Sequence, residues 1–378
     1  MAAEKAAWQP RVRDNMAIPK KNQLVGLDIG SHSIKLVEIN DTKKGRILTN
    51  FGLAGLPPHA VVEGMIKEME IVSSAIRNLF RNLKVKNKNV AISVSGASVI
   101  VKKITVTDKR ESELEATIYD EAEQYIPFDI NDVNLDFDIL SVGEETGRGR
   151  EPEAEDAGSN QMEVMLVAAK KDAVDDYVSL LHVCDLNGMV LDVDAFALQN
   201  AFEINAEAPE GCYALVNVGA EELGINIVKD GGSLFTRGAS YGGAQMTEAI
   251  RSRLDVDYER AERIKLGGEE ADLEKAGLKE IMGSIISEWV QEIKRALDFV
   301  VSTYPEEKIR KILVCGGSQK IPGFQEYLRM KTEIPVEEFN PFSNLITDEK
   351  RFDPNYLREV GPQAAVAVGL ALRSIGDK

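Results

Sequence analysis

Apolar and polar residues alternate along residues 27–39, LDIGSHSIKLVEI, on both sides of a short polar turn. Leu27 and Ile29 precede the turn, and the alternation resumes at Ile34. A period of two is typical of a half-buried strand pair, and Gly and Ser are common turn residues. The pattern predicts a β-hairpin with its tip at Gly30–Ser33. On these residues alone an ordinary turn is the simpler interpretation, and a phosphate-binding loop is the alternative.

The following segments alternate between helical and strand patterns. Apolar residues recur every three or four positions over residues 65–83, which predicts an amphipathic helix, and a strand is predicted at 90–94. Residues 172–187 carry another helical stripe, which should end at Gly188 and lead into the strand MVLDV. These elements predict an α/β domain.

Residues 99–169 have a different order of elements. The pattern predicts a strand, a helix that opens with the capping pair Asp108 and Glu111 and stops at Pro127, and two further strands. We interpret this unit as a small inserted domain. Residues 143–160, between its last two strands, are highly charged, so we expect a solvated, mobile loop, with an acidic docking site as the alternative.

The hairpin pattern occurs a second time in the chain. Residues 216–228, VNVGAEELGINIV, align with the first hairpin without a gap, so that Asn217 matches Asp28 and Gly219 matches Gly30. Such an internal duplication predicts two similar α/β domains with their polar turns facing one cleft. Interfaces between domains are favoured ligand sites.

Composition narrows the class of partner. The chain has 378 residues, enough for two or three domains, and its net charge of −17 disfavours nucleic-acid binding, which depends on clustered Lys and Arg. Its three Cys residues lie apart in or near apolar segments, so we expect buried free thiols in a reducing cytoplasm. No apolar run has the about 20 residues of a membrane-spanning helix, so no direct membrane insertion is expected. Residues 1–22 should form a disordered leader, within which Met16 is an alternative start.

Three segments of the second half have both an ordinary and a functional interpretation. The segment ILVCGGSQKIPGF predicts a buried strand ending at Gly316 and Gly317, which is either a common connection or a place where a flat ligand can approach the backbone. The segment AERIK places Glu262 and Lys265 on one helix face, as a surface ion pair or a ligand contact. The segment GPQAAVAVGLALR predicts a buried helix whose small residues allow close packing.

In this order and spacing the motifs resemble those of the actin, Hsp70 and sugar-kinase superfamily, over residues 23–373. The resemblance implies an actin-like α/β fold, a duplicated ribonuclease-H-like unit that binds ATP and Mg²⁺ between two domains. The residues that match its motifs are Asp28, Gly30 and Lys35 for the first phosphate motif, Asn217, Gly219 and Ala220 for the second, Gly316, Gly317 and Ser318 for adenosine, and Glu262 and Lys265 for ribose and adenine.

The same resemblance implies roles for individual groups. Lys35 would pair with the β-phosphate and Asp28 would hold the magnesium ion through water. The segment LDVDAFALQNAF is similar to the first connecting helix of the superfamily, which places the candidate catalytic residue Asp194 near the expected water or metal. The tip amides that would cradle the phosphate belong to Gly30, Ser31, His32 and Ser33.

Asn217 departs from the superfamily pattern, which usually has Asp at this position. An amide adds no charge to a metal site and accepts no proton, so we expect ATP to be held but hydrolysed slowly or not at all. The alternative is that Asn217 only caps its turn, a role that Asn fills well.

Within the superfamily, the inserted unit resembles that of the FtsA and PilM families. The phrases DIGSHSIKLVEI, EAEQYIPFDINDVNLDF and VDAFALQNA are similar to PilM proteins of type IV pilus assembly, and the chain ends at Lys378 without the C-terminal amphipathic helix of FtsA. The resemblance implies a cytoplasmic scaffold that binds the N-terminal tail of the inner-membrane protein PilN, alongside other inner-membrane and motor proteins of the pilus. The alternatives are an FtsA-like filament, or an active kinase or chaperone-type ATPase.

These patterns define the expected domain organisation. The segments are a leader at 1–22, the first actin-like domain at 23–96 and 172–210, the inserted FtsA-like subdomain at 97–171, the second actin-like domain at 211–360 with a helical subdomain at about 243–285, and a closing helix at 361–378.

Overall fold

The structure is a computed structural model that describes residues 22–107, 109–142, 161–205, 211–269 and 277–377. The predicted leader and the predicted loop at 143–160 therefore lie outside the described residues, apart from Asn22.

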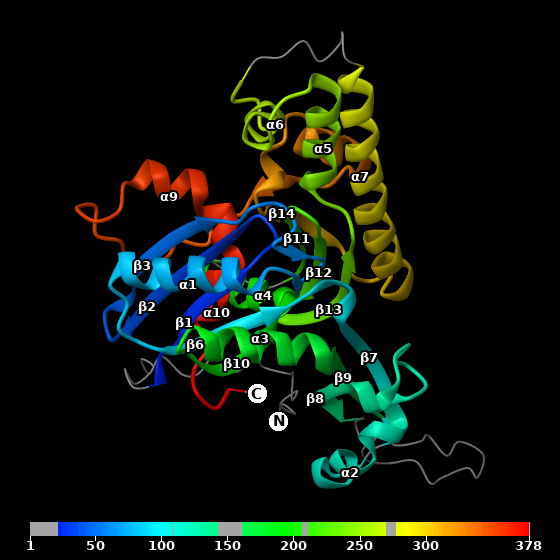
Figure 1. The fold of residues 1–378 in the computed structure, drawn as a ribbon. Helices are drawn as coiled ribbons and strands as arrows, with labels where there is room; N and C mark the ends of the chain where they lie inside the picture. The colour runs from blue at the N-terminus through cyan, green and yellow to red at the C-terminus, as the bar shows by residue number, and fades with distance from the viewer. Residues whose placement is uncertain (1–21, 108, 143–160, 206–210, 270–276, 378) are drawn as a thin grey trace, which may run out of the picture.

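Two five-stranded sheets have the same topology (Figure 1). In order across the first sheet, its strands are β10 (Asn187–Val193), β6 (Asn89–Val94), β1 (Val25–Ile29), β2 (Ser33–Thr42) and β3 (Gly45–Gly55). The corresponding strands of the second sheet are β15 (Val336–Glu338), β14 (Ile309–Cys315), β11 (Cys212–Val218), β12 (Leu223–Lys229) and β13 (Gly232–Ala239). The predicted duplication is therefore confirmed, because both halves begin with an antiparallel hairpin and continue through a parallel neighbour.

Helices cover both faces of the sheets. On the outer face of the first sheet lie α1 (Met69–Leu83) and α3 (Lys171–Val183), together with the short hairpin β4 (Val61–Val62) and β5 (Met65–Ile66). The second sheet is covered by α5 (Gly243–Leu254), α6 (Tyr258–Lys265), α7 (Leu278–Thr303) and α8 (Phe324–Thr332). Helices α4 (Asp194–Asn205) and α10 (Ala365–Ala371) share one core with residues of both sheets, and α9 (Pro354–Val360) precedes α10.

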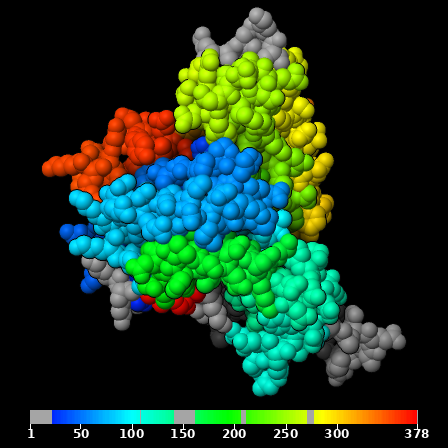
Figure 2. All heavy atoms as spheres, in the orientation of Figure 1, coloured from blue at the N-terminus to red at the C-terminus, as the bar shows by residue number. Residues whose placement is uncertain are grey.

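A third, smaller sheet has its own hydrophobic core. Its strands, in order β7 (Val99–Thr107), β9 (Gln161–Lys170) and β8 (Val133–Val142), are antiparallel and pack against α2 (Glu111–Ala122). Figure 2 shows this inserted subdomain as a lobe beside α3, at the end of the molecule away from α5 and α6.

Several predicted helix ends were wrong. Helix α1 begins at Met69 because Met65 and Ile66 pair with β4 as a strand. Helix α2 begins at Glu111, where Glu113 bonds the backbone of Arg110, and it ends before the predicted Pro127.

Helix α3 ends at Val183 rather than at residue 187. The reason is Asp185, which adopts a left-handed backbone conformation with φ of 56°, and the following residues enter β10. The prediction about the thiols is confirmed, because Cys184, Cys212 and Cys315 are all free and buried.

The close crossing of α4 and α10 depends on a single glycine. A methyl group on Gly369 would lie 1.6 Å from the carbonyl oxygen of Ala197 on α4, and both atoms are fixed in helical backbone. Because neither backbone can yield locally, Gly369→Ala should lower the free energy of unfolding by about 1–3 kcal/mol or more.

Urea denaturation of the full chain tests this prediction. Gly283→Ala is the matched control, because Gly283 lies in the second turn of α7 and a Cβ there would meet nothing within 4 Å. A glycine-to-alanine change there should stabilise the protein by roughly 0.4–1 kcal/mol. Equal stability of the Gly369→Ala variant and the unmodified protein would contradict the argument.

Candidate functional site

The two hairpin tips have matching geometry. In the first, the Gly30 amide donates to the Ser33 carbonyl at 3.2 Å, and in the second the Gly219 amide donates to the Glu222 carbonyl at 2.8 Å. The Gly30 amide is thus already used by its own turn, which leaves the following tip amides as the donors for a ligand.

Both tips line one cavity of about 440 Å³ between the two domains. The cavity is also lined by the ends of α4 and α6 and by the turn after β14. The sequence-predicted residues that it brings together are Asp28, Gly30, Ser31, His32, Ser33, Lys35, Asp194, Asn217, Gly219, Ala220, Glu262, Lys265, Gly316, Gly317 and Ser318.

A buried ion pair lies beside the first tip. Lys35 on β2 is directly opposite Asp28 on β1, and its Nζ lies 3.2 Å from a carboxylate oxygen of Asp28. The two side chains are only 14% and 11% exposed. Cβ on Gly30 would approach this Nζ to 3.1 Å, so the glycine leaves the lysine access to the tip.

The turn after β14 closes the opposite side of the cavity. Gly316 has φ of +85°, and a Cβ there would lie 2.3 Å from the Val218 carbonyl oxygen and 2.6 Å from Oδ1 of Asn217. The hydroxyl of Ser318 donates to the Gly219 carbonyl at 2.7 Å. Only glycine fits at Gly316, so this turn is held tightly against the second hairpin.

Glu262 and Lys265 form a buried pair rather than a surface pair. The ammonium of Lys265 lies 2.5 Å from Glu262 and donates to Thr247 at 2.9 Å, and its side chain is 4% exposed. Burial lowers the pKa of Lys265, whereas Glu262 raises it. Gly243 leaves room for this packing, because a Cβ there would lie 3.0 Å from the Lys265 ammonium and 2.2 Å from the Ser318 hydroxyl.

His32 reaches across the cleft to α6. Its ring stacks on Tyr258 with centroids 6.2 Å apart, and its Nδ1 lies 3.3 Å from the tyrosine hydroxyl. Burial lowers the pKa of His32 below its usual value, and it raises the pKa of Tyr258 to about 12. A neutral imidazole therefore covers this part of the cavity at neutral pH.

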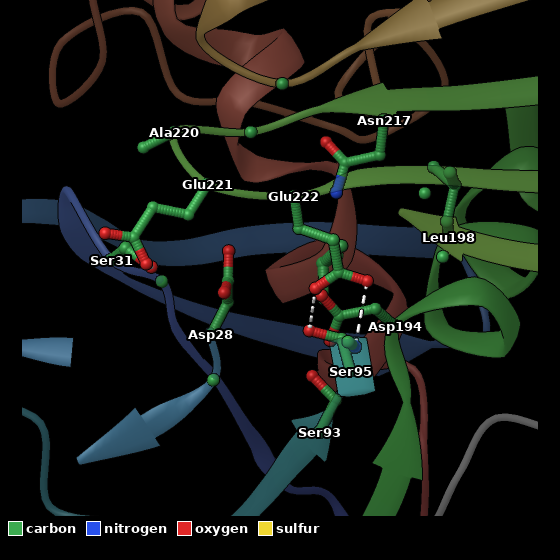
Figure 3. Close-up of a pocket in the computed structure, with 18 of the residues that line it drawn as sticks. Asp28, Ser31, Ser93, Ser95, Asp194, Leu198, Asn217, Ala220, Glu221 and Glu222 are labelled. Atoms are coloured by element: carbon green, nitrogen blue, oxygen red, sulfur yellow. Dashed lines mark hydrogen bonds between the residues drawn. The ribbon is translucent and has the colours of Figure 1, made fainter. Parts of the chain in front are cut away.

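Asp194 is the first residue of α4 and faces the other carboxylates of the cavity (Figure 3). Burial raises its pKa well above the usual value, and the negative charges of Asp28 and Glu222 raise it further. A hydrogen bond from Ser93 and the charge of Lys35 oppose this effect. A cation bound in the cavity would relieve the repulsion among these acids.

Two adjacent carboxylates that the sequence analysis did not select bridge the domains. Glu221 accepts from the Ser31 hydroxyl at 3.1 Å and from the Glu63 amide at 2.8 Å. Glu222 accepts from the Ser95 hydroxyl at 2.6 Å and from the Gly96 amide at 2.9 Å (Figure 3).

The duplication contained the signal for these two residues. In the alignment of the two hairpins, Glu221 and Glu222 stand opposite His32 and Ser33 of the predicted phosphate tip. Extending the motif by two positions would have selected them. The other contacting residues that sequence reasoning missed are Gly243, Thr247 and Tyr258.

Two α/β domains of equal topology that share a cleft, with α4 and α10 between their sheets, define the actin-like fold. The family model of the type IV pilus assembly protein PilM matches residues 26–375, so this chain belongs to the PilM family.

Solved structures agree with both the fold and the family. The PilM-PilN type IV pilus biogenesis complex contains a chain that is 29% identical, with a TM-score of 0.80 and coverage of 94% of this chain and 99% of that chain. The ethanolamine utilization protein EutJ from Carboxydothermus hydrogenoformans shares the fold at 14% identity, with a TM-score of 0.54 and coverage of 94% and 91%. Among the described residues, no helix combines the length and apolar character needed to cross a membrane.

Proposed function

We propose that this protein is a cytoplasmic scaffold of type IV pilus assembly that binds ATP with Mg²⁺ and docks the N-terminal cytoplasmic peptide of PilN. The observation that carries the ATP assignment is the convergence of both hairpin tips, the glycine turn and the Glu262–Lys265 pair on one cavity. Through PilN it would lie next to the inner membrane and contact the other inner-membrane and motor proteins of the pilus.

The lining residues fit a nucleotide. A cavity of about 440 Å³ lies within the usual range of small-ligand sites, roughly 300–1,000 Å³. Lys35 supplies a positive charge at the first tip, and Gly317 leaves open backbone, since the nearest atom to a Cβ there would be in Gln363, at 3.7 Å. Both features suit a phosphate on one side and a flat base on the other.

The acidic residues of the cavity fit a nucleotide only together with a cation. Asp28, Asp194, Glu221 and Glu222 all line it, and their charges would repel phosphate. Mg²⁺ would neutralise part of this charge and prefers oxygen ligands. In the described part of the chain no three acidic, His or Cys residues are placed to hold a metal by themselves, which suits the proposal that Asp28 contacts the ion through water.

The inserted subdomain offers a surface for an extended peptide. Its strand β8 lies at the edge of the three-stranded sheet, with β9 on one side. Helix α3, which follows β9 directly in the chain and contacts it, presents Val178, whose side chain is 58% exposed. An extended peptide can pair with a sheet edge while its apolar side chains enter an adjacent groove.

A pair of variants tests the docking surface. Val178→Asp should weaken binding of a synthetic N-terminal peptide of the cognate PilN by about tenfold, because a charge would replace an apolar contact worth about 1.4 kcal/mol. Isothermal titration calorimetry measures this affinity.

Deleting residues 143–160 should leave the peptide affinity unchanged. Val142 of β8 pairs with Met162 of β9, so the strand ends lie side by side, and the deletion variant carries a short Asn-Gly turn between Val142 and Gln161. Loss of binding in a deletion variant that keeps its circular dichroism spectrum would instead place the docking site in the deleted segment.

A further inference from the structure

Glu222 connects the second hairpin tip to the start of the inserted subdomain. Its carboxylate accepts from the Ser95 hydroxyl at 2.6 Å and from the Gly96 amide at 2.9 Å. These donors lie between β6, in the first sheet, and β7, the first strand of the inserted subdomain. In Figure 3 the Glu222 side chain points away from its own turn toward Ser95.

Two glycines shape the space around this carboxylate. Gly96 has φ of +70°, and a Cβ there would lie 3.3 Å from one carboxylate oxygen of Glu222. A Cβ at Gly238 on β13 would lie 3.0 Å from the other oxygen. Burial raises the pKa of Glu222, and the hydrogen bonds from Ser95 and Gly96 oppose this effect. The glutamate is therefore enclosed by elements of both domains.

Strand β7 contacts the second domain beyond this point. It lies beside β13 (Figure 1), and the ammonium of Lys103 lies 5.7 Å from the ring centre of Tyr304, just after α7. The inserted subdomain is thus attached to one domain by the chain and touches the other through β7. A movement of the second hairpin tip would therefore be transmitted directly to the inserted subdomain.

We propose that Glu222 couples the nucleotide cleft to the peptide-docking surface of the inserted subdomain, an inference that rests on the proposed function. Glu222 closes the same turn that presents Gly219 and Ala220, through the bond from the Gly219 amide to its carbonyl at 2.8 Å. A phosphate held by this turn adds negative charge next to the Glu222 carboxylate.

Like-charge repulsion then holds the carboxylate in the position that it already has on Ser95 and Gly96, at the wall of the cavity. ATP thereby orders the start of β7 and tightens peptide binding. By linkage the peptide tightens ATP binding by the same factor. Glu222 is a positioning residue in this device, because it acts through the backbone of Gly96 rather than on either ligand.

The test is a thermodynamic cycle measured by calorimetry. Peptide affinity is determined with and without saturating ATP and Mg²⁺ for the unmodified protein, Glu222→Ala and Glu221→Ala. We expect ATP to tighten peptide binding at least about fivefold in the unmodified protein, the lower end of typical couplings. The ratio of peptide affinities with and without ATP should fall below about twofold in Glu222→Ala, since the hydrogen bonds from Ser95 and Gly96 to this side chain are then lost.

Glu221→Ala is the matched comparison, because it removes a neighbouring carboxylate that bridges the domains at Ser31 and Glu63 but does not touch Gly96. Glu221 also lines the cavity, so its removal alters the ATP affinity, but at saturating ATP the coupling should be retained. Glu222→Gln is a second, more conservative variant, because it keeps one acceptor for the Gly96 amide. It should give an intermediate ratio of peptide affinities with and without ATP. Hydrogen exchange of the amides at residues 96–101 should slow on addition of ATP alone in the unmodified protein and not in Glu222→Ala.

The outcomes separate this inference from the proposed function. An unchanged ratio in Glu222→Ala, an equal loss in Glu221→Ala, or a ratio of one in the unmodified protein overturns the coupling while both ligands still bind. Failure of the unmodified protein to bind ATP or the peptide alone overturns the proposed function, and the coupling with it.

Discussion

Replacing Lys35 with Ala is expected to weaken ATP binding by about 10- to 150-fold, the range for a lost charge-assisted hydrogen bond of about 1.5–3 kcal/mol. The side chain is 14% exposed and its ammonium is held at the first tip by Asp28, so its charge is poorly screened by water. Loss of the lysine also leaves the carboxylate of Asp28 unpaired beside the phosphate. Calorimetric titration with ATP and Mg²⁺ measures the effect.

Two further variants test whether the effect is specific to the phosphate site. Lys294→Ala is the matched control, because Lys294 pairs with Asp298 at the same distance of 3.2 Å but lies exposed on α7, outside the cavity. It should bind ATP normally. Asp28→Ala should also weaken binding and should make the remaining affinity insensitive to Mg²⁺. Unchanged ATP affinity in both the Lys35 and the Asp28 variants would overturn the phosphate-site assignment.

The features that the sequence predicted correctly are local or repeated. The hairpin register that pairs Asp28 with Lys35 follows from the period-two pattern and the turn residues between them. The second hairpin follows from the same pattern at residues 216–228, and the equal order of the two sheets follows from the duplication. Such features can be predicted from the sequence because residues close together in the chain determine them.

The features that it missed depend on contacts between distant segments. Ser31 and Glu221 are 190 positions apart, and no local pattern brings them together. Glu262 and Lys265 have the spacing of a surface pair, yet Thr247 and Gly243 on another helix bury them. The end of α3 was missed for a different reason, because the apolar stripe continues past the residue whose backbone breaks the helix.

Asn217→Asp is expected to raise the rate of ATP hydrolysis from slow or undetectable by about 10- to 100-fold, equivalent to about 1.4–2.7 kcal/mol of transition-state stabilisation. Asn217 lies on β11 opposite Gly224, and its side chain lines the cavity (Figure 3). Its Oδ1 lies next to the Gly316 backbone. Its amide is neutral, so it cannot accept a proton or attract a cation. A carboxylate there would help to orient and activate the attacking water.

The same substitution should lower the stability of the protein without ligand. A further negative charge beside Asp28, Asp194 and Glu222 would raise the pKa of Asp194 more and destabilise the cleft until Mg²⁺ binds. We therefore expect Asn217→Asp to have a lower melting temperature alone and to recover it with ATP and Mg²⁺. Thermal unfolding with and without the two ligands measures this change.

Asn217→Ala separates this chemistry from a capping role. The second tip closes through the backbone bond between Gly219 and Glu222, so removing the amide should cost little stability and should not speed hydrolysis. Single-turnover assays with radiolabelled ATP compare the three proteins. Turnover of several per second in the unmodified protein, or no acceleration in Asn217→Asp, would show that Asn217 is not what limits hydrolysis. Slow hydrolysis by the unmodified protein and acceleration only by the added carboxylate would mean that this cleft retains ATP as a conformational ligand, because tight phosphate binding through Lys35 and the tip amides requires no carboxylate at residue 217.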